Sequence, residues 1–215
     1  MLNLPALPAH LQRLAGRGVA DAAMGGLSSG GVNHVSIRMN RFTLVDAAGN
    51  KQPLQSFHMD AVIVDANPHM SKIYYKEAFD PNAEDFKPPV CFSDNGLAPS
   101  RQAQEPQNKT CSDCPLNAWG SDVSRVTGKR TKACNDVKKI AIFRPEDPSM
   151  VFLLRVPPAS LKLLGGYIKT LIGNNVEPSM MITRISFDPQ TQGVLNFAAV
   201  NWIDEKQAAR VNEIL

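Results

Sequence analysis

The 215-residue sequence has no apolar run close to the ~20 residues that a helix needs to cross a bilayer. Its first residues, MLNLPALPAHLQRLAG, lack the basic start and the continuous apolar stretch of a signal peptide. These absences exclude a protein with membrane-spanning helices and predict a cytoplasmic location, with no membrane partner. In that compartment thiols stay reduced, so a disulfide framework is not expected.

Several catalytic signatures are also missing. The sequence contains no HExxH and no HxE motif, so the metalloprotease and deaminase patterns are absent. The stretch GLSSGG lacks the lysine of a phosphate-binding loop, and no cluster of carboxylates suggests a nuclease. We therefore expect a binding protein rather than an enzyme.

Cysteine is scarce, and its spacing is the strongest motif in the chain. The four cysteines follow the pattern C-x19-C-x2-C-x19-C, at Cys91, Cys111, Cys114 and Cys134. Four thiolates with one C-x2-C pair are typical of a structural zinc site, in which the metal takes the place of a hydrophobic core. An iron–sulfur cluster could use the same four ligands. A redox dithiol fits less well, because no strand precedes Cys111 and no helix clearly follows Cys114.

Hydrophobic periodicity predicts a mainly β fold. Residues alternate with a period of two in VSIRM, FTLVD, DAVIVDA, KIYYK, KKIAIFR, MVFLLRV, SMMITRISF and VLNFAAVNW. A single long helix, predicted over 158–173, interrupts this series of strands. Short turns between consecutive strands indicate antiparallel pairing. We predict an OB-fold-like antiparallel barrel with few helices.

The same pattern predicts three parts. Residues 1–33 form a short helix and a flexible connector. Residues 34–79 and 138–215 form the barrel. Residues 80–137 lose all periodicity and contain every cysteine, so we interpret them as an inserted zinc-binding subdomain.

Positive charge concentrates in the cysteine segment. The whole chain carries a net charge of +3, whereas residues 101–139 carry eight Lys or Arg against four Asp or Glu, a net +4. A basic track beside aromatic side chains is typical of proteins that bind single-stranded nucleic acid, while a solvated basic loop remains the alternative. The residues that we expect to contact the nucleic acid are Arg38, Arg41, Lys72, Tyr74, Lys76, Trp119, Arg125, Lys129, Arg130 and Lys132.

The two tyrosines of SKIYYK are expected to have different roles. Strand alternation sends Tyr74 and Tyr75 to opposite faces, and it places Tyr74 on the same face as Lys72 and Lys76. We therefore expect Tyr74 to be exposed and Tyr75 to pack in the core. Trp119 could either stack on a base or pack against the metal site.

A family resemblance rests on the cysteine-centred stretches PPVCFSDNGLAPS, QNKTCSDCPLNAWGS and GKRTKACNDVKKIAIFRPE. Over roughly residues 34–200 the chain resembles phage- and prophage-encoded proteins with a four-cysteine segment. In plan it is also similar to the zinc-containing single-stranded DNA-binding proteins of large tailed phages. That resemblance implies an OB-fold with an inserted zinc subdomain and zinc on the four cysteines. The phage proteins use a histidine ligand and end in a long acidic tail, and this chain has neither.

These observations together predict a non-enzymatic, sequence-independent single-stranded DNA-binding protein of the phage type, acting in replication or recombination in the host cytoplasm. The alternative is a phage transcription or replication accessory factor that binds a polymerase through its zinc module. The sequence does not indicate an oligomeric state.

Overall fold

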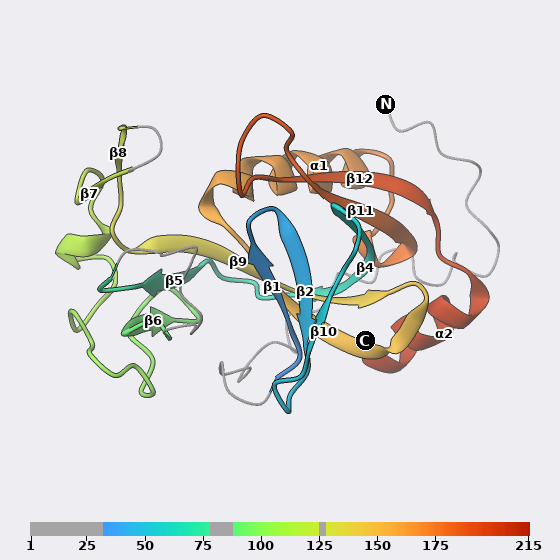
Figure 1. The fold of residues 1–215 in the computed structure, drawn as a ribbon, viewed down its shortest axis with the longest axis horizontal. Helices are drawn as coiled ribbons and strands as arrows, with labels where there is room; N and C mark the ends of the chain where they lie inside the picture. The colour runs from blue at the N-terminus through green and yellow to red at the C-terminus, as the bar shows by residue number, and fades with distance from the viewer. Residues whose placement is uncertain (1–31, 78–87, 125–127) are drawn as a thin grey trace. The chain divides into compact units, whose positions relative to one another are not determined.

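The chain is divided into two compact units. The computed structural model describes residues 32–77, 88–124 and 128–215. Unit 1 contains the described residues up to Asn67 together with Lys139–Leu215. Unit 2 is Pro68–Lys138. Figure 1 shows the ribbon of the chain with its helices and strands labelled.

Unit 1 is built on one curled sheet that forms a half-barrel. The order across the sheet is β12-β11-β4-β9-β10-β1-β2-β3. The strands are β1 (His34–Arg38), β2 (Arg41–Val45), β3 (Lys51–Pro53), β4 (His58–Ala66), β9 (Asn135–Arg144), β10 (Asp147–Val156), β11 (Met181–Phe187) and β12 (Leu195–Trp202). Strands β1 and β10 pair in parallel, whereas β4 pairs in an antiparallel manner with both β9 and β11.

The middle of the sheet is buried on both faces. Residues 61–65 of β4 and 140–143 of β9 are consecutive buried positions, so the period of two expected for these strands gives way in their middle to the apolar runs 61–64 and 140–143. The largest fully buried side chains of the core are Phe42, Phe143, Met59, Ile142, Leu154, Leu171, Met180, Met181, Ile185 and Leu195. In the described part of the chain, no residue of 68–138 belongs to this core.

Two α-helices complete unit 1. Helix α1 (Leu161–Gly173) follows a 3-10 turn at Pro158–Ser160 and packs on β12, burying Leu164, Tyr167 and Leu171 at helical spacing. Helix α2 (Glu205–Ile214) begins at Asp204, whose carboxylate accepts a hydrogen bond from the Gln207 backbone N–H at 2.8 Å. Among the described residues, neither helix has the length and apolar character that crossing a membrane requires.

Unit 2 contains little regular structure. Strand β5 (Ser71–Tyr74) lies between β6 (Cys91–Ser93) and the first residues of β9. A second, two-stranded sheet joins β7 (Asp122–Val123) to β8 (Arg130–Thr131), and a 3-10 turn covers Pro115–Asn117.

The mainly β class that the sequence predicts is confirmed. The division of the chain differs from the expected one, because unit 2 begins at Pro68 and not at residue 80. Strand β5 pairs with β6 and with the first residues of β9, and so belongs with the cysteine segment. The expected N-terminal helix and most of the connector, within residues 1–33, lie outside the described residues.

The burial of the Tyr167 hydroxyl makes the stability of unit 1 depend on pH. The Tyr167 hydroxyl lies 2.7 Å from Thr183 Oγ1, and burial raises the pKa of Tyr167 to about 12. The same phenol titrates near 10 in an unfolded chain. The folded state therefore holds this proton between about pH 10 and 12, where the unfolded state releases it, and the corresponding stability is lost as the pH rises through that window.

We predict that Tyr167→Phe destabilises the protein by about 1–3 kcal/mol below pH 10, because Thr183 loses its buried partner. The difference in unfolding free energy between the wild type and the variant should then shrink between about pH 10 and 12. Urea unfolding of both proteins across this range measures that difference, and all other titrating groups cancel because both proteins carry them. A difference that stays constant from pH 8 to pH 12 would contradict the assignment.

Candidate metal centre and nucleic-acid interface

Strand β5 sets the positions of the two outer cysteines. On one side Tyr74 is paired with Cys91 of β6, and on the other side Ile73 is paired with Asn135 of β9. Cys134 comes one residue before that ladder. Cys91 and Cys134, which are 43 positions apart in the sequence, are thus held on opposite sides of β5.

The central C-x2-C turn is tied to both flanks through backbone hydrogen bonds. The Cys111 N–H donates to the Leu97 carbonyl at 2.8 Å, and the Cys134 N–H donates to the Leu116 carbonyl at 2.8 Å. Within the turn, the Asn117 N–H donates to the Cys114 carbonyl at 2.9 Å, and the Asn117 side-chain amide donates to the Cys111 carbonyl at 2.8 Å. These bonds fix the turn against Cys134 without using any thiol.

All four cysteines line one cavity of about 20 Å³ in unit 2. Cys91, Cys111 and Cys134 are buried, Cys114 is half-buried, and none forms a disulfide. Burial raises the pKa of the Cys134 thiol to about 11; the positive charge of Lys72 lowers this pKa, while the other three cysteines raise it. The Cys134 thiol therefore lies within electrostatic range of Lys72 and of the other three cysteines.

The chemistry of this donor set fits zinc, which takes four thiolates in closed structural sites. Three of the four thiols are buried around a shared cavity, and the carbonyls of the C-x2-C turn are occupied by other hydrogen bonds. The thiols are not drawn together, however: within residues 32–77, 88–124 and 128–215, no three Cys, His, Asp or Glu side chains stand in an arrangement that could hold a metal. The residues fit the metal by type and by their shared cavity, and binding would require the thiols to move closer together.

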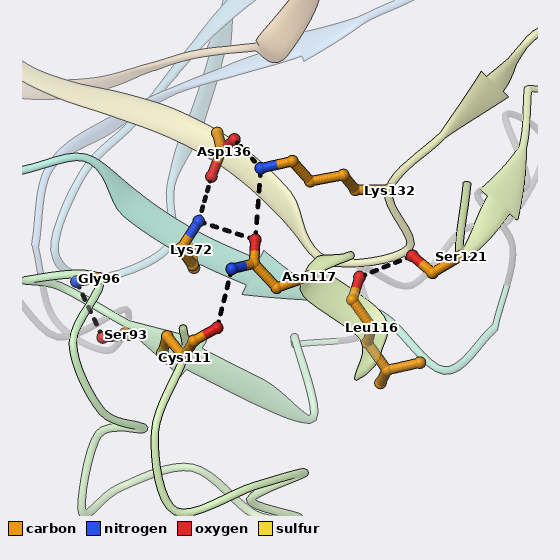
Figure 2. Close-up of polar contacts among 9 residues, drawn as sticks. All are labelled: Lys72, Ser93, Gly96, Cys111, Leu116, Asn117, Ser121, Lys132 and Asp136. Atoms are coloured by element: carbon orange, nitrogen blue, oxygen red, sulfur yellow. Dashed lines mark hydrogen bonds and ion pairs between the residues drawn. The ribbon is translucent and has the colours of Figure 1, made fainter. Parts of the chain in front are cut away.

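A network of charged and polar side chains lies beside the cavity (Figure 2). Lys72 Nζ lies 2.5 Å from Asp136 Oδ1, and Lys132 Nζ lies 2.7 Å from Asp136 Oδ2. Both ammonium groups also donate to Asn117 Oδ1, at 2.9 and 3.3 Å. Because these two cations keep the pKa of Asp136 below its ordinary value against the opposing effect of burial, the carboxylate stays ionised.

This network changes the role expected for two of the predicted DNA contacts. The side chains of Lys72 and Lys132 are only 13% and 27% exposed, and each is engaged by Asp136 and Asn117. Strand alternation correctly puts Lys72 and Tyr74 on one face, but that face is half-buried and lines the cysteine cavity. The two lysines stabilise unit 2 internally rather than forming an exposed phosphate track.

The expected burial of Tyr75 is wrong. Tyr75 follows the last residue of β5 and is half-buried, as Tyr74 is. Side chains alternate between two faces only within a strand, and β5 ends at Tyr74. The alternation therefore does not predict on which side Tyr75 lies. Lys76 is exposed and pairs with Glu105 at 3.0 Å, and this carboxylate raises the pKa of Lys76.

The remaining predicted contacts in unit 2 gather near the β7–β8 pair. Trp119 is 71% exposed, so it does not pack against the cysteine cavity. Lys129 and Arg130 are exposed at the start of β8. Gly120 has a positive φ of 86°, and a Cβ there would lie 2.6 Å from Arg130 Nη2, so the absent side chain leaves room for the guanidinium. Arg125 lies outside the described residues.

In unit 1 the predicted arginines occupy the tip of the β1–β2 hairpin. Arg38 and Arg41 are directly paired across a two-residue turn in which Met39 and Asn40 have positive φ. The Arg41 guanidinium lies 5.5 Å from the ring centroid of Phe57, which is 63% exposed. Phe57 was not among the predicted contacts, because it lies in a turn between strands, where periodicity carries no signal.

The loop before the C-x2-C turn depends on a second glycine. Gly96 has a φ of 70°, and a Cβ there would lie 2.6 Å from the Met70 carbonyl oxygen. Gly128 has a φ of 67°, but a Cβ at that position would meet no atom within 4 Å. We predict that Gly128→Ala costs roughly 1–2 kcal/mol, the cost of the left-handed backbone alone. Gly96→Ala should cost clearly more, because the clash adds to the same backbone strain.

Hydrogen exchange of the amides of 88–124 and 128–138 measures how much protection each variant loses, and both substitutions lie in unit 2. Equal losses of protection in Gly96→Ala and Gly128→Ala would show that the close approach of Gly96 to Met70 does not exist in solution. The comparison is matched, because both positions require a positive φ and differ only in their surroundings.

No protein-family model, no curated protein and no solved structure matches the chain. Its function must therefore be inferred from its own side chains. Two features carry chemistry: the cavity lined by Cys91, Cys111, Cys114 and Cys134, and the exposed group of Trp119, Lys129 and Arg130.

Proposed function

We propose that the protein binds single-stranded DNA without sequence preference and without enzymatic turnover, as a phage-type protein of replication or recombination. In this proposal the curled sheet of unit 1 is an OB-fold-like barrel, and unit 2 is an inserted subdomain organised by zinc on the four cysteines. The observation that carries the proposal is the exposure of Trp119, at 71%, beside the exposed cations Lys129 and Arg130.

An exposed tryptophan is costly in water unless it has a partner, and every unpaired base offers a flat face on which an indole ring can stack. Trp119 is held by short-range structure: the Ala118 N–H donates to the Pro115 carbonyl at 3.2 Å, and the Gly120 N–H donates to the Thr131 carbonyl at 2.9 Å. The ring is therefore presented on a fixed backbone. Cations on the adjacent β8 strand would neutralise the phosphates on either side of a stacked base.

Zinc is proposed as the element that organises this backbone. The hydrophobic core of unit 1 takes nothing from the described part of unit 2, and a small unit without such a core usually needs a metal or disulfides. The cysteines are free and line a common cavity. Zinc bound by four thiolates has no open coordination position, so its role would be structural.

The proposed phosphate contacts are revised by the geometry. Lys72 and Lys132 are removed, because Asp136 engages both. Arg38 and Arg41 are kept, since they face each other across the β1–β2 strand pair and bring two cations to one hairpin tip. Phe57, stacked under Arg41 and exposed, is added as a second aromatic platform, in unit 1.

A second candidate function is that of a transcription or replication accessory factor that binds a polymerase through unit 2. Leu97 and Val123 favour it, because they are 68% and 53% exposed, and apolar side chains in the open are typical of protein-binding surfaces. In that case Trp119 would enter a protein pocket rather than stack on a base.

We predict that the freshly purified protein contains about one zinc ion per chain by elemental analysis, as expected for a four-cysteine site. Cys114→Ser should lower the bound zinc and reduce the amide protection of 88–124, because the metal would add direct bonds between segments that are otherwise joined by hydrogen bonds and ion pairs. Removal of the metal by a chelator should have the same effect. A fully protected unit 2 without metal, or iron in place of zinc, would overturn the assignment.

We predict that Trp119→Ala weakens binding to a single-stranded oligonucleotide by roughly tenfold, since one stacked base contributes about 1–3 kcal/mol. Leu97→Ala is the matched control, because Leu97 is similarly exposed and lies in the same unit, but has no π-face. Fluorescence anisotropy with single-stranded and duplex oligonucleotides of one length measures both. Equal affinity for duplex, or an equal loss in both variants, would favour the protein-binding alternative.

The electrostatic part of the proposal has a separate test. The slope of log affinity against log salt should be flattened by about 0.7 for each phosphate contact that a variant removes. The double variant of Lys129 and Arg130 to alanine should flatten it, and Lys132→Ala should change it less, because Asp136 and Asn117 both engage the Lys132 ammonium group and its side chain is only 27% exposed. A larger effect for Lys132 than for the double variant would place the track on the other side of β8.

A further inference from the structure

We propose that Lys72 is the electrostatic counterpart of an anionic metal centre: its ammonium group supplies the positive charge that lets four thiolates and a divalent metal share the cavity. This inference rests on the zinc proposed above and assigns a role to residues outside the ligand set. It is carried by the arrangement of Lys72, Lys132, Asp136 and Asn117 in Figure 2.

The cluster beside the cavity holds more positive than negative charge. Two ammonium groups, on Lys72 and Lys132, share the single carboxylate of Asp136, one on each oxygen. Their further hydrogen bonds go to the neutral amide oxygen of Asn117. The cluster therefore carries one positive charge in excess, with side chains that are 13%, 27% and 25% exposed. An excess charge that is partly withdrawn from water is stabilised by a nearby opposite charge.

Lys72 brings this excess charge to the cysteines. It lines the cavity together with all four of them, whereas Lys132 is not among the residues that line it. A divalent metal on four thiolates leaves a dianion, because the thiolates outweigh the metal charge. The excess charge of the cluster and the charge of such a centre are of opposite sign, and both are shielded from water.

The ammonium group of Lys72 is held in place from several sides. Lys72 is in β5, between the strand of Cys91 and the segment of Cys134. Through Asn117, which accepts from Lys72 and donates to the Cys111 carbonyl, the same ammonium group is connected to the C-x2-C turn. Lys72 is thus a positioning residue with a fixed charge, and residues of this kind around metal ligands commonly change metal affinity by about 10–100-fold.

The test compares zinc affinities of the full chain by competition with a chromophoric chelator. Lys72→Met removes the charge and keeps the length of the side chain, and we expect it to weaken zinc binding by roughly tenfold or more. Lys132→Met is the matched control, because it removes a cation from the same carboxylate outside the cavity lining. We expect it to have a clearly smaller effect.

Asp136→Asn distinguishes an electrostatic role of Lys72 from a purely structural one. It keeps both lysines and removes the carboxylate that partly neutralises them, so an electrostatic role predicts equal or tighter zinc binding. A purely structural role predicts a loss as large as that of Lys72→Met. If Lys72→Met fails to fold, Asp136→Asn still tests the role of Lys72. Lys72→Arg keeps the charge and should bind zinc with an affinity within a few-fold of that of the wild type.

Failure of the zinc site and failure of the Lys72 role are distinguishable. A wild-type chain that binds no metal would overturn both. A wild type that binds zinc, with Lys72→Met equal to it or Asp136→Asn as weak as Lys72→Met, would overturn the role of Lys72 and leave the zinc site standing. Loss of DNA binding alone would bear on neither, because the readout is metal affinity.

Discussion

The contact of one carboxylate, that of Asp136, with two lysines is the charged interaction around which the cysteine segment is arranged. Asp136 lies at the start of β9 and joins Lys72 of β5 to Lys132, the residue four positions before it. Unit 2 needs such contacts, because the apolar core formed by the described residues lies in unit 1. Where apolar burial is small, fixed charges and backbone hydrogen bonds must define the positions of the chain, and each of them is more consequential than it would be on the surface of a larger core.

The strands of unit 1 other than β3 could be predicted from the sequence because each alternates or is apolar over several residues, whereas β3 reads KQP and is exposed throughout. The division of the chain could not be predicted. The stretch SKIY of β5 alternates as the other strands do, and its partners, β6 and the start of β9, are determined by residues far away in the sequence. Local periodicity predicts that a strand exists, but it does not predict with which strand it pairs. The parallel pairing of β1 with β10 was missed for the same reason.

The candidate site shows the same limit at the level of single side chains. The cysteine spacing identified four residues that line one cavity, because chelating turns have a characteristic local pattern. The partners of Lys72 are 45 and 64 positions away in the sequence, so no local pattern could distinguish it from an exposed lysine such as Lys76. Phe57 was missed because it lies in a turn without periodicity and meets its partner Arg41 only in the folded protein.

The equal spacing of the cysteines has a consequence for how unit 2 assembles. The segments between Cys91 and Cys111 and between Cys114 and Cys134 each contain 19 residues. Closing a flexible loop of this length costs an entropy equivalent to about 2.6 kcal/mol plus a constant, and here the length-dependent cost is the same for both arms. Once the central turn has formed, chain entropy alone gives neither flank an advantage. The order of closure must then be decided by local structure, and each arm has one backbone hydrogen bond to the turn, from the Cys111 N–H to the Leu97 carbonyl and from the Cys134 N–H to the Leu116 carbonyl.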